Sequence, residues 1–101
     1  MRLTDQQRAI IRATVAETFG AGAEVWLFGS RVDDSKRGGD IDLLIETDQS
    51  DLNAIMRSEI AFLSKVQMKL GEQKIDVLLD YPSRKIRPPI FYIAKQTGIL
   101  L

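Results

Sequence analysis

The chain has 101 residues, of which 45% are apolar, so it is sized for one compact domain with a single core. Its 14 basic and 14 acidic residues balance, which argues against direct nucleic-acid binding because that needs clustered positive charge. Cysteine and histidine are both absent, which excludes disulfides, the usual zinc sites and thiolate or imidazole catalysis, and leaves carboxylates, hydroxyls, lysine and arginine for any chemistry.

The first predicted element is a helix over residues 5–19. Thr4 and Gln7 have the spacing of a capping box, and apolar residues recur through the segment that follows. A glycine directly after this segment ends the helix. A short strand over residues 24–29 comes next, because EVWLFG combines β-branched and aromatic residues and stops at a glycine.

A loop and a second strand are predicted next. Residues 31–39 are polar, charged and rich in glycine, which predicts a loop. The segment DIDLLIE, over residues 40–46, has a continuous apolar run with carboxylates only at its two ends. That pattern is typical of a buried strand with a solvated entrance. We expect Glu46, Asp48 and Asp80, which fall at strand ends, to be solvated surface residues.

A long helix is the clearest element of the sequence. After a polar turn over residues 47–50, apolar residues recur at steps of mostly three and four positions. The members of this stripe are Leu52, Ile55, Met56, Ile60, Leu63, Val66 and Leu70. Gly71 is a suitable residue to end the helix, and KIDVLLD, over residues 74–80, predicts a third strand before a Tyr81-Pro82 turn.

The last predicted helix starts at Pro88 or Pro89, since proline is tolerated in a first helical turn, and runs to Thr97. The C-terminal part of the chain is unusually apolar for a small protein. Its large apolar residues are Phe91, Tyr92, Ile93, Ile99, Leu100 and Leu101. We expect some of them to pack on the sheet and the remainder to form a partner surface.

These elements follow the order α-β-β-α-β-α and predict a small α/β (α+β) domain over residues 1–101, with helices packed on a mixed sheet. The second and third strands are joined by a long helix, so they can lie parallel through a right-handed crossover. The first and second strands are joined by a loop, which is compatible with an antiparallel pair.

Three carboxylates are expected to meet at one edge of this sheet. Asp40 and Asp42 are two positions apart, so on a strand both point to the same face, about 6.5–7 Å apart. Asp76 lies near the start of the third strand, and parallel pairing brings it beside them. Because the first strand must finish where the second begins, Gly29 and Ser30 reach the same edge.

Such a cluster suits a metal ion and a nucleoside triphosphate. Carboxylates held close together repel one another unless a cation neutralises them. Oxygen ligands favour Mg²⁺ or Mn²⁺, and two ions would activate an attacking hydroxyl and stabilise a departing pyrophosphate. Gly29 lets a phosphate approach the backbone, Ser30 can donate a hydroxyl hydrogen bond, and Arg31 can add a bidentate contact.

With these residues in place, the sequence resembles the DNA-polymerase-β-like nucleotidyltransferases. Their signature appears here as FGS at residues 28–30, DID at residues 40–42 and a later strand-borne acid within KIDVL. The short length and the ending IAKQTGILL look most like the minimal nucleotidyltransferase antitoxins, which pair with HEPN-domain toxins. The resemblance implies Mg²⁺-dependent transfer of AMP from ATP to a tyrosine of the partner toxin. The catalytic and metal-binding residues would be Asp40, Asp42 and Asp76, and the nucleotide-binding residues Gly29, Ser30 and Arg31.

Two alternatives stay open. The chain could be a non-catalytic, nucleotide-binding antitoxin that neutralises its partner by covering it, or a nucleotidyltransferase that acts on a small molecule. The first interpretation, an antitoxin that modifies its partner, predicts a hetero-oligomer with a HEPN-domain toxin. No apolar run approaches the roughly 20 residues that span a membrane, and the N-terminus lacks a signal-peptide core, so we expect a cytoplasmic protein.

Overall fold

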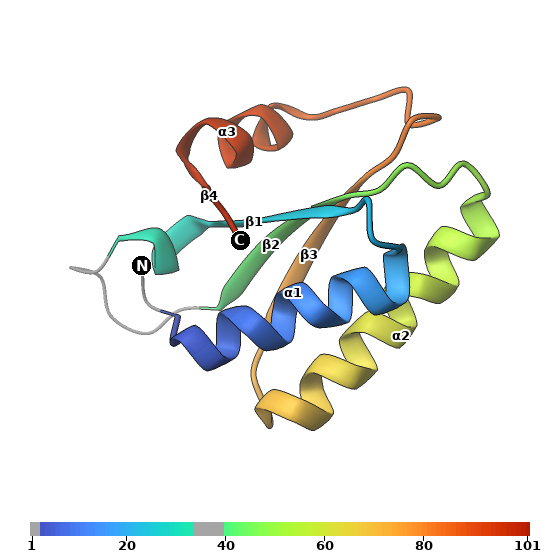
Figure 1. Ribbon diagram of the computed structural model, residues 1–101. Coiled ribbons are helices and arrows are strands. Elements are labelled where there is room, and N and C mark those ends of the chain that lie inside the picture. Colours follow the sequence, from blue (N-terminus) through green and yellow to red (C-terminus); the bar gives the residue numbers. More distant parts are fainter. Residues whose placement is uncertain (1–2, 34–39) are drawn as a thin grey trace.

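The computed structural model describes residues 3–33 and 40–101, so most of the predicted loop over residues 31–39 lies outside the described residues. The described elements confirm the predicted order and add a 3-10 helix, η1, and a short last strand (Figure 1). They are α1 (Asp5–Phe19), β1 (Glu24–Phe28), η1 (Gly29–Val32), β2 (Ile41–Glu46), α2 (Leu52–Leu70), β3 (Ile75–Asp80), α3 (Pro89–Thr97) and β4 (Ile99–Leu100).

The strands form one mixed sheet in the order β3-β2-β1-β4. β1 runs antiparallel to β2 and to β4, whereas β2 and β3 are parallel neighbours joined through α2. Helices α1 and α2 cover one face of the sheet, and α3 lies on the other (Figure 1). The predicted α/β (α+β) fold and its parallel crossover are therefore confirmed.

Local signals set the helix ends where the sequence predicted them. In the capping box of α1, the Gln7 N–H donates to Thr4 Oγ1 and the Thr4 N–H donates to Gln7 Oε1, both at 3.0 Å. The side chain of Asp51 caps α2 by accepting from the Asn53 N–H at 3.1 Å. Gly71 ends α2 with φ +82°, a conformation that favours glycine.

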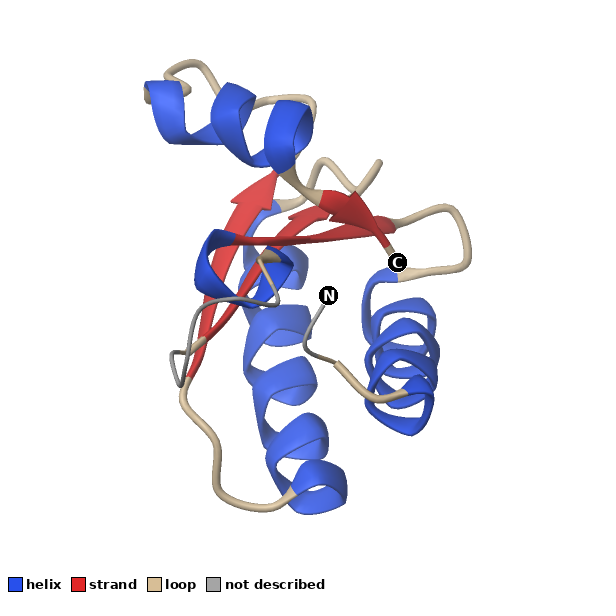
Figure 2. Ribbon diagram, turned by 90° about the vertical axis from the view of Figure 1, so that its left-hand side faces the viewer, coloured by secondary structure: helices blue, strands red, loops and turns tan. Residues whose placement is uncertain are grey.

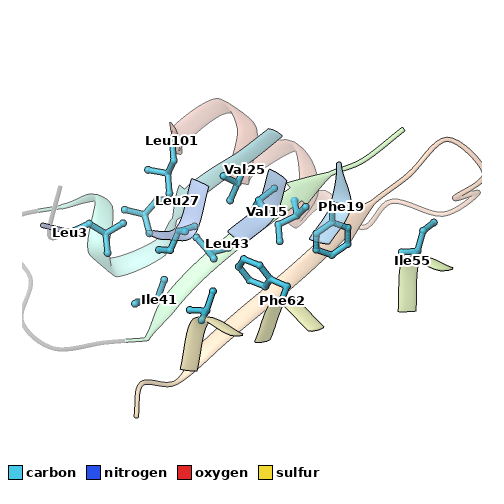
Figure 3. Close-up of a cluster of buried hydrophobic side chains, with 13 residues drawn as sticks. Leu3, Val15, Phe19, Val25, Leu27, Ile41, Leu43, Ile55, Phe62 and Leu101 are labelled. Carbon is cyan, nitrogen blue, oxygen red and sulfur yellow. The ribbon is translucent and has the colours of Figure 1, made fainter. Parts of the chain in front are cut away.

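The main core lies between the sheet and the pair of helices α1 and α2 (Figure 3). Phe19 of α1 and Phe62 of α2 meet there with ring centroids 6.1 Å apart. Ile41 and Leu43 of β2 face them and are fully buried. β2 is therefore the central strand on which both helices pack.

The predicted apolar stripe of α2 is wrong in part. Phe62, which was not in the stripe, is fully buried, whereas Met56 is 57% exposed and Ile60 is 69% exposed. The buried face of α2 instead follows Ile55, Phe62 and Val66. The reason is that β3 is the last strand of the sheet, so nothing among the described residues covers the flank of α2 that lies beyond it.

A smaller core packs α3 against the opposite face of the sheet. Phe91 and Ala94 of α3 bury Leu44 of β2, flanked by partly buried Trp26, Phe28 and Leu78. The expectation for the apolar tail is confirmed in one respect, because Phe91 and Leu101 are buried. Tyr92, Ile93 and Leu100 remain exposed.

The chain end forms β4, an element that the sequence did not predict. Ile99 and Leu100 pair with β1, and the Leu101 N–H donates to the Val25 carbonyl at 2.8 Å. Arg8 of α1 then donates to the Leu101 carbonyl at 3.2 Å.

In the described part of the chain, no helix is long and apolar enough to span a bilayer.

Candidate active site

The structure brings the predicted acids to the same edge of the sheet. In the parallel ladder of β2 and β3, Asp42 lies directly opposite Asp76. Asp40 comes just before β2, at the entrance of the strand. Asp42 alternates with the buried Ile41 and Leu43, so it points to the α3 side of the sheet. The predicted approach of Asp76 to the acids of the second strand is therefore observed, and its partner in the ladder is Asp42.

The acids repel one another in the absence of a cation. The pKa of Asp42 is raised, first because burial penalises its charged form and then because the charges of Asp76 and Asp40 lie close. A side-chain hydrogen bond with Asp76 raises it further, while the charge of Lys74 lowers it. The cluster is thus short of positive charge, which a bound cation would supply.

Lys74 is a basic group beside these acids that the sequence did not single out. Its Nζ lies 3.4 Å from Asp40 Oδ2, and its side chain is otherwise largely exposed. The Lys74 carbonyl accepts from the Ile41 N–H at 3.0 Å, which fixes the backbone beside the acids. The signal available in the sequence was a lysine two positions before Asp76, on the same face of the strand.

The turn that follows β1 approaches the acid cluster closely. Phe28, the last residue of β1, pairs with Asp42 across the antiparallel ladder. Gly29 then has φ +77°, and a Cβ added there would overlap Asp42 Oδ2 and lie 3.2 Å from its Cγ. Glycine is therefore required at position 29 both for its backbone conformation and for the space that the carboxylate occupies.

The other predicted phosphate ligands lie in the same turn. Ser30 and Arg31 belong to η1, which contacts β1 and β2. Both are partly buried. The structure thus gathers Gly29, Ser30 and Arg31 beside Asp42, while their roles as nucleotide ligands stay predictions.

The donors of this site suit a hard cation. Within residues 3–33 and 40–101, no three or more histidine, cysteine, aspartate or glutamate side chains are already arranged to hold a metal ion. Mg²⁺, however, usually takes only one or two protein carboxylates and fills its other positions with water and phosphate oxygens. Asp42 and Asp76, which lie directly opposite one another on neighbouring strands, meet that requirement.

The acids at the opposite end of the sheet serve the fold. Asp80 was expected to be solvated, and that expectation is wrong, because it is only 8% exposed. Its Oδ1 accepts from Arg87 Nε at 2.8 Å and from the Tyr81 N–H at 2.9 Å. A cavity of about 290 Å³ lies beside this pair and contains none of the predicted site residues. The ion pair therefore closes the turn after β3.

Another basic residue of the segment after β3, Arg84, packs on aromatic rings. The guanidinium carbon of Arg84 lies 4.5 Å from the centroid of the Phe91 ring and 5.9 Å from that of Tyr81. Such cation–π contacts hold the segment between β3 and α3 against the sheet.

Comparison with known proteins agrees with this geometry. The family model described as "Nucleotidyltransferase domain" matches residues 8–100, a range that includes all six predicted site residues. A comparison with curated proteins found no significant match. Members of this family use a nucleoside triphosphate and a divalent metal ion. The match spans nearly the whole chain, and the protein therefore belongs to the nucleotidyltransferase domain family.

Proposed function

We propose that this protein transfers AMP from ATP, with Mg²⁺, to a tyrosine of a cognate HEPN-domain toxin and so acts as its antitoxin. The observation that carries the proposed chemistry is the pairing of Asp42 with Asp76 beside the turn at Gly29. The protein acceptor and the toxin partner are supported by the sequence resemblance to minimal nucleotidyltransferase antitoxins. Adenylylation of the toxin would block its RNase activity.

The turn at η1 holds the triphosphate. Gly29 has no side chain, so a phosphate can approach its backbone, and the Ser30 hydroxyl and the Arg31 guanidinium donate hydrogen bonds to phosphate oxygens. Asp40 and Asp42, with Asp76, would hold Mg²⁺ through carboxylate oxygens. Bound there, two Mg²⁺ ions would neutralise charge on the triphosphate and on the leaving pyrophosphate.

The acceptor reacts at the exposed end of the cluster. The acceptor hydroxyl oxygen forms a bond to the α-phosphorus of ATP, and the bond from that phosphorus to the α,β-bridging oxygen breaks. Pyrophosphate leaves with the bridging oxygen, and the hydroxyl proton passes to Asp76. This role suits Asp76 because it is exposed, whereas Asp42 is partly buried.

Label transfer from α-labelled ATP to the partner protein tests the proposal. We expect transfer to require Mg²⁺ and to fall at least about 1000-fold in Asp42→Asn and in Asp76→Asn, since each removes a charge that the reaction uses. Asp48→Asn is a matched control, because Asp48 is exposed and lies beyond the far end of β2.

Two outcomes would count against catalysis. Undiminished transfer by Asp42→Asn would show that another group performs the chemistry. Full neutralisation of the toxin by an Asp40→Asn, Asp42→Asn double variant that no longer transfers label would show instead that the protein acts by covering its partner.

A further inference from the structure

The outer edge of β3 is open and leads into the catalytic acids. Among the described strands, β3 is the last of the sheet, with β2 on its inner side. The α-helices lie on the two faces of the sheet, one above it and two below it in Figure 2. The Ile41 and Thr47 N–H groups donate to the carbonyls of Lys74 and Asp80, so the even-numbered residues of this strand face β2. By alternation, Ile75, Val77 and Leu79 direct their N–H and C=O groups outward.

This edge has none of four devices that commonly keep strands apart: lysine, proline, a bulge and short length. The register of β3 with β2 is unbroken from Ile75 to Asp80, and the strand contains neither lysine nor proline. An open, regular edge of this kind can accept an additional strand through main-chain hydrogen bonds.

An apolar groove runs beside the same edge. Its volume is about 390 Å³, and its walls come from α2, β3 and the segment between β3 and α3. Leu52 and Met56 of α2 line one side and are 52% and 57% exposed, and Ile90 of α3 lines the other. Apolar side chains of a docked segment would cover these residues.

One end of the groove carries a positive charge. Arg84 lines the groove, with its guanidinium held over the Phe91 ring. Its Nε is buried and has no hydrogen-bond partner in the described part of the chain. Glu59 of α2 also lines the groove, so a carboxylate of a docked segment is favoured at Arg84 and disfavoured on the α2 side.

We propose that the outer edge of β3 and this groove bind an extended segment of the acceptor protein, with its acceptor hydroxyl opposite Asp76; this rests on the proposed function. Directly opposite residues on paired strands have Cβ atoms about 4.5–5.5 Å apart and share one face. A tyrosine opposite Asp76 on the added strand thus faces the acid cluster. Apolar residues of the segment cover the groove, and an acidic residue about four positions along reaches Arg84.

Three variants and a control test the surface. Val77→Pro removes an outward N–H without breaking the ladder to β2. Met56→Glu places a charge in the groove, and Arg84→Gln removes the positive charge. Met68→Glu is the matched control, because Met68 lies on α2, is 83% exposed and does not line the groove.

The binding experiment uses the whole chain and the HEPN-domain partner protein. It measures the Kd of the chain for the partner and, separately, its Kd for MgATP. We expect Val77→Pro, Met56→Glu and Arg84→Gln each to raise the partner's Kd at least about 10-fold. MgATP binding should be unchanged in Met56→Glu and Arg84→Gln, and the unfolding temperature should be unchanged in Met56→Glu. Mass spectrometry of the labelled partner should place AMP on a residue with an acidic neighbour about four positions away.

The possible outcomes test the docking surface separately from the transfer reaction. Equal binding of the partner by Met56→Glu and Met68→Glu would overturn the docking surface, whether or not label is transferred. Partner binding that is lost in Met56→Glu, without any label transfer by the wild type, would overturn the acceptor role and the proposed function while locating the interface. Dimers of the chain alone that dissociate in Met56→Glu would assign the groove to a second copy and overturn the proposal.

Discussion

Gly29→Ala should damage the acid cluster more than it damages the fold. At φ +77°, alanine is strained by about 1–3 kcal/mol. The added Cβ would overlap Asp42 Oδ2 and lie 3.2 Å from Cγ, so the carboxylate has to move away from the turn. A misplacement of about 1 Å in a reacting geometry can lower the rate about 100-fold. We therefore expect a loss of stability of about 1–3 kcal/mol and a fall in nucleotidyl transfer of about 100-fold.

Gly71→Ala is the matched control for backbone strain. Gly71 has φ +82°, close to that of Gly29, but a Cβ added there meets no atom within 4 Å. The substitution should lower the free energy of unfolding by a similar amount, about 1–3 kcal/mol. Transfer should remain at the wild-type rate, because the added Cβ displaces no neighbouring atom.

The two variants are compared by urea unfolding and by initial rates of label transfer from α-labelled ATP, at a temperature where both are folded. We expect the two variants to have similar free energies of unfolding and transfer rates that differ about 100-fold. Equal rates in the two variants would refute the inference that the close approach of Gly29 positions the Asp42 carboxylate.

The remaining predictions concern charge and packing. In the metal-free protein, the raised pKa of Asp42 means that its protonation stabilises the fold below the ordinary aspartate pKa of about 4. This stabilisation is lost as pH rises, so Asp42→Asn should raise Tm more at neutral pH than at acidic pH. Differential scanning fluorimetry across pH, with and without Mg²⁺, measures this. Arg87→Ala leaves the nearly buried Asp80 without its ion pair and should lose about 1–3 kcal/mol in urea unfolding. Lys65→Ala, at the exposed pair with Glu17, should lose clearly less. Phe62→Ala should lose about 3–5 kcal/mol by the same measurement.

A specific result would contradict each of these predictions. A Tm of Asp42→Asn that matches the wild type at every pH would mean that the acids do not repel one another without metal. Equal losses for Arg87→Ala and Lys65→Ala would place the Asp80 pair among solvated surface pairs. A loss below about 1 kcal/mol for Phe62→Ala would contradict its place in the core.

Much of the fold could be predicted because its signals are local. The Thr4 and Gln7 capping box, the apolar run of β2 and the glycines after α1 and α2 each act over a few neighbouring residues. β4 could not be predicted in this way, because two residues form a strand only through pairing with β1. The buried face of α2 was also misjudged, since it depends on which strand ends the sheet.

The site, too, has one part that could be predicted from the sequence and another that could not. The meeting of Asp42 and Asp76 followed from strand order and the period of two, which the sequence carries. The contact of Gly29 with Asp42 and the position of Lys74 beside Asp40 depend on side-chain packing across strands. The Asp80 and Arg87 pair likewise forms only when the turn after β3 folds back.

The intact mass of the partner protein, after incubation with this chain, ATP and Mg²⁺, tests the central claim most directly. The account predicts that the mass increases by one or more AMP units with the wild type and does not change with Asp42→Asn or Asp76→Asn. An unchanged mass with the wild type, or an increase that persists in both variants, would contradict the assignment of the carboxylates beside Gly29 as a nucleotidyl-transfer site.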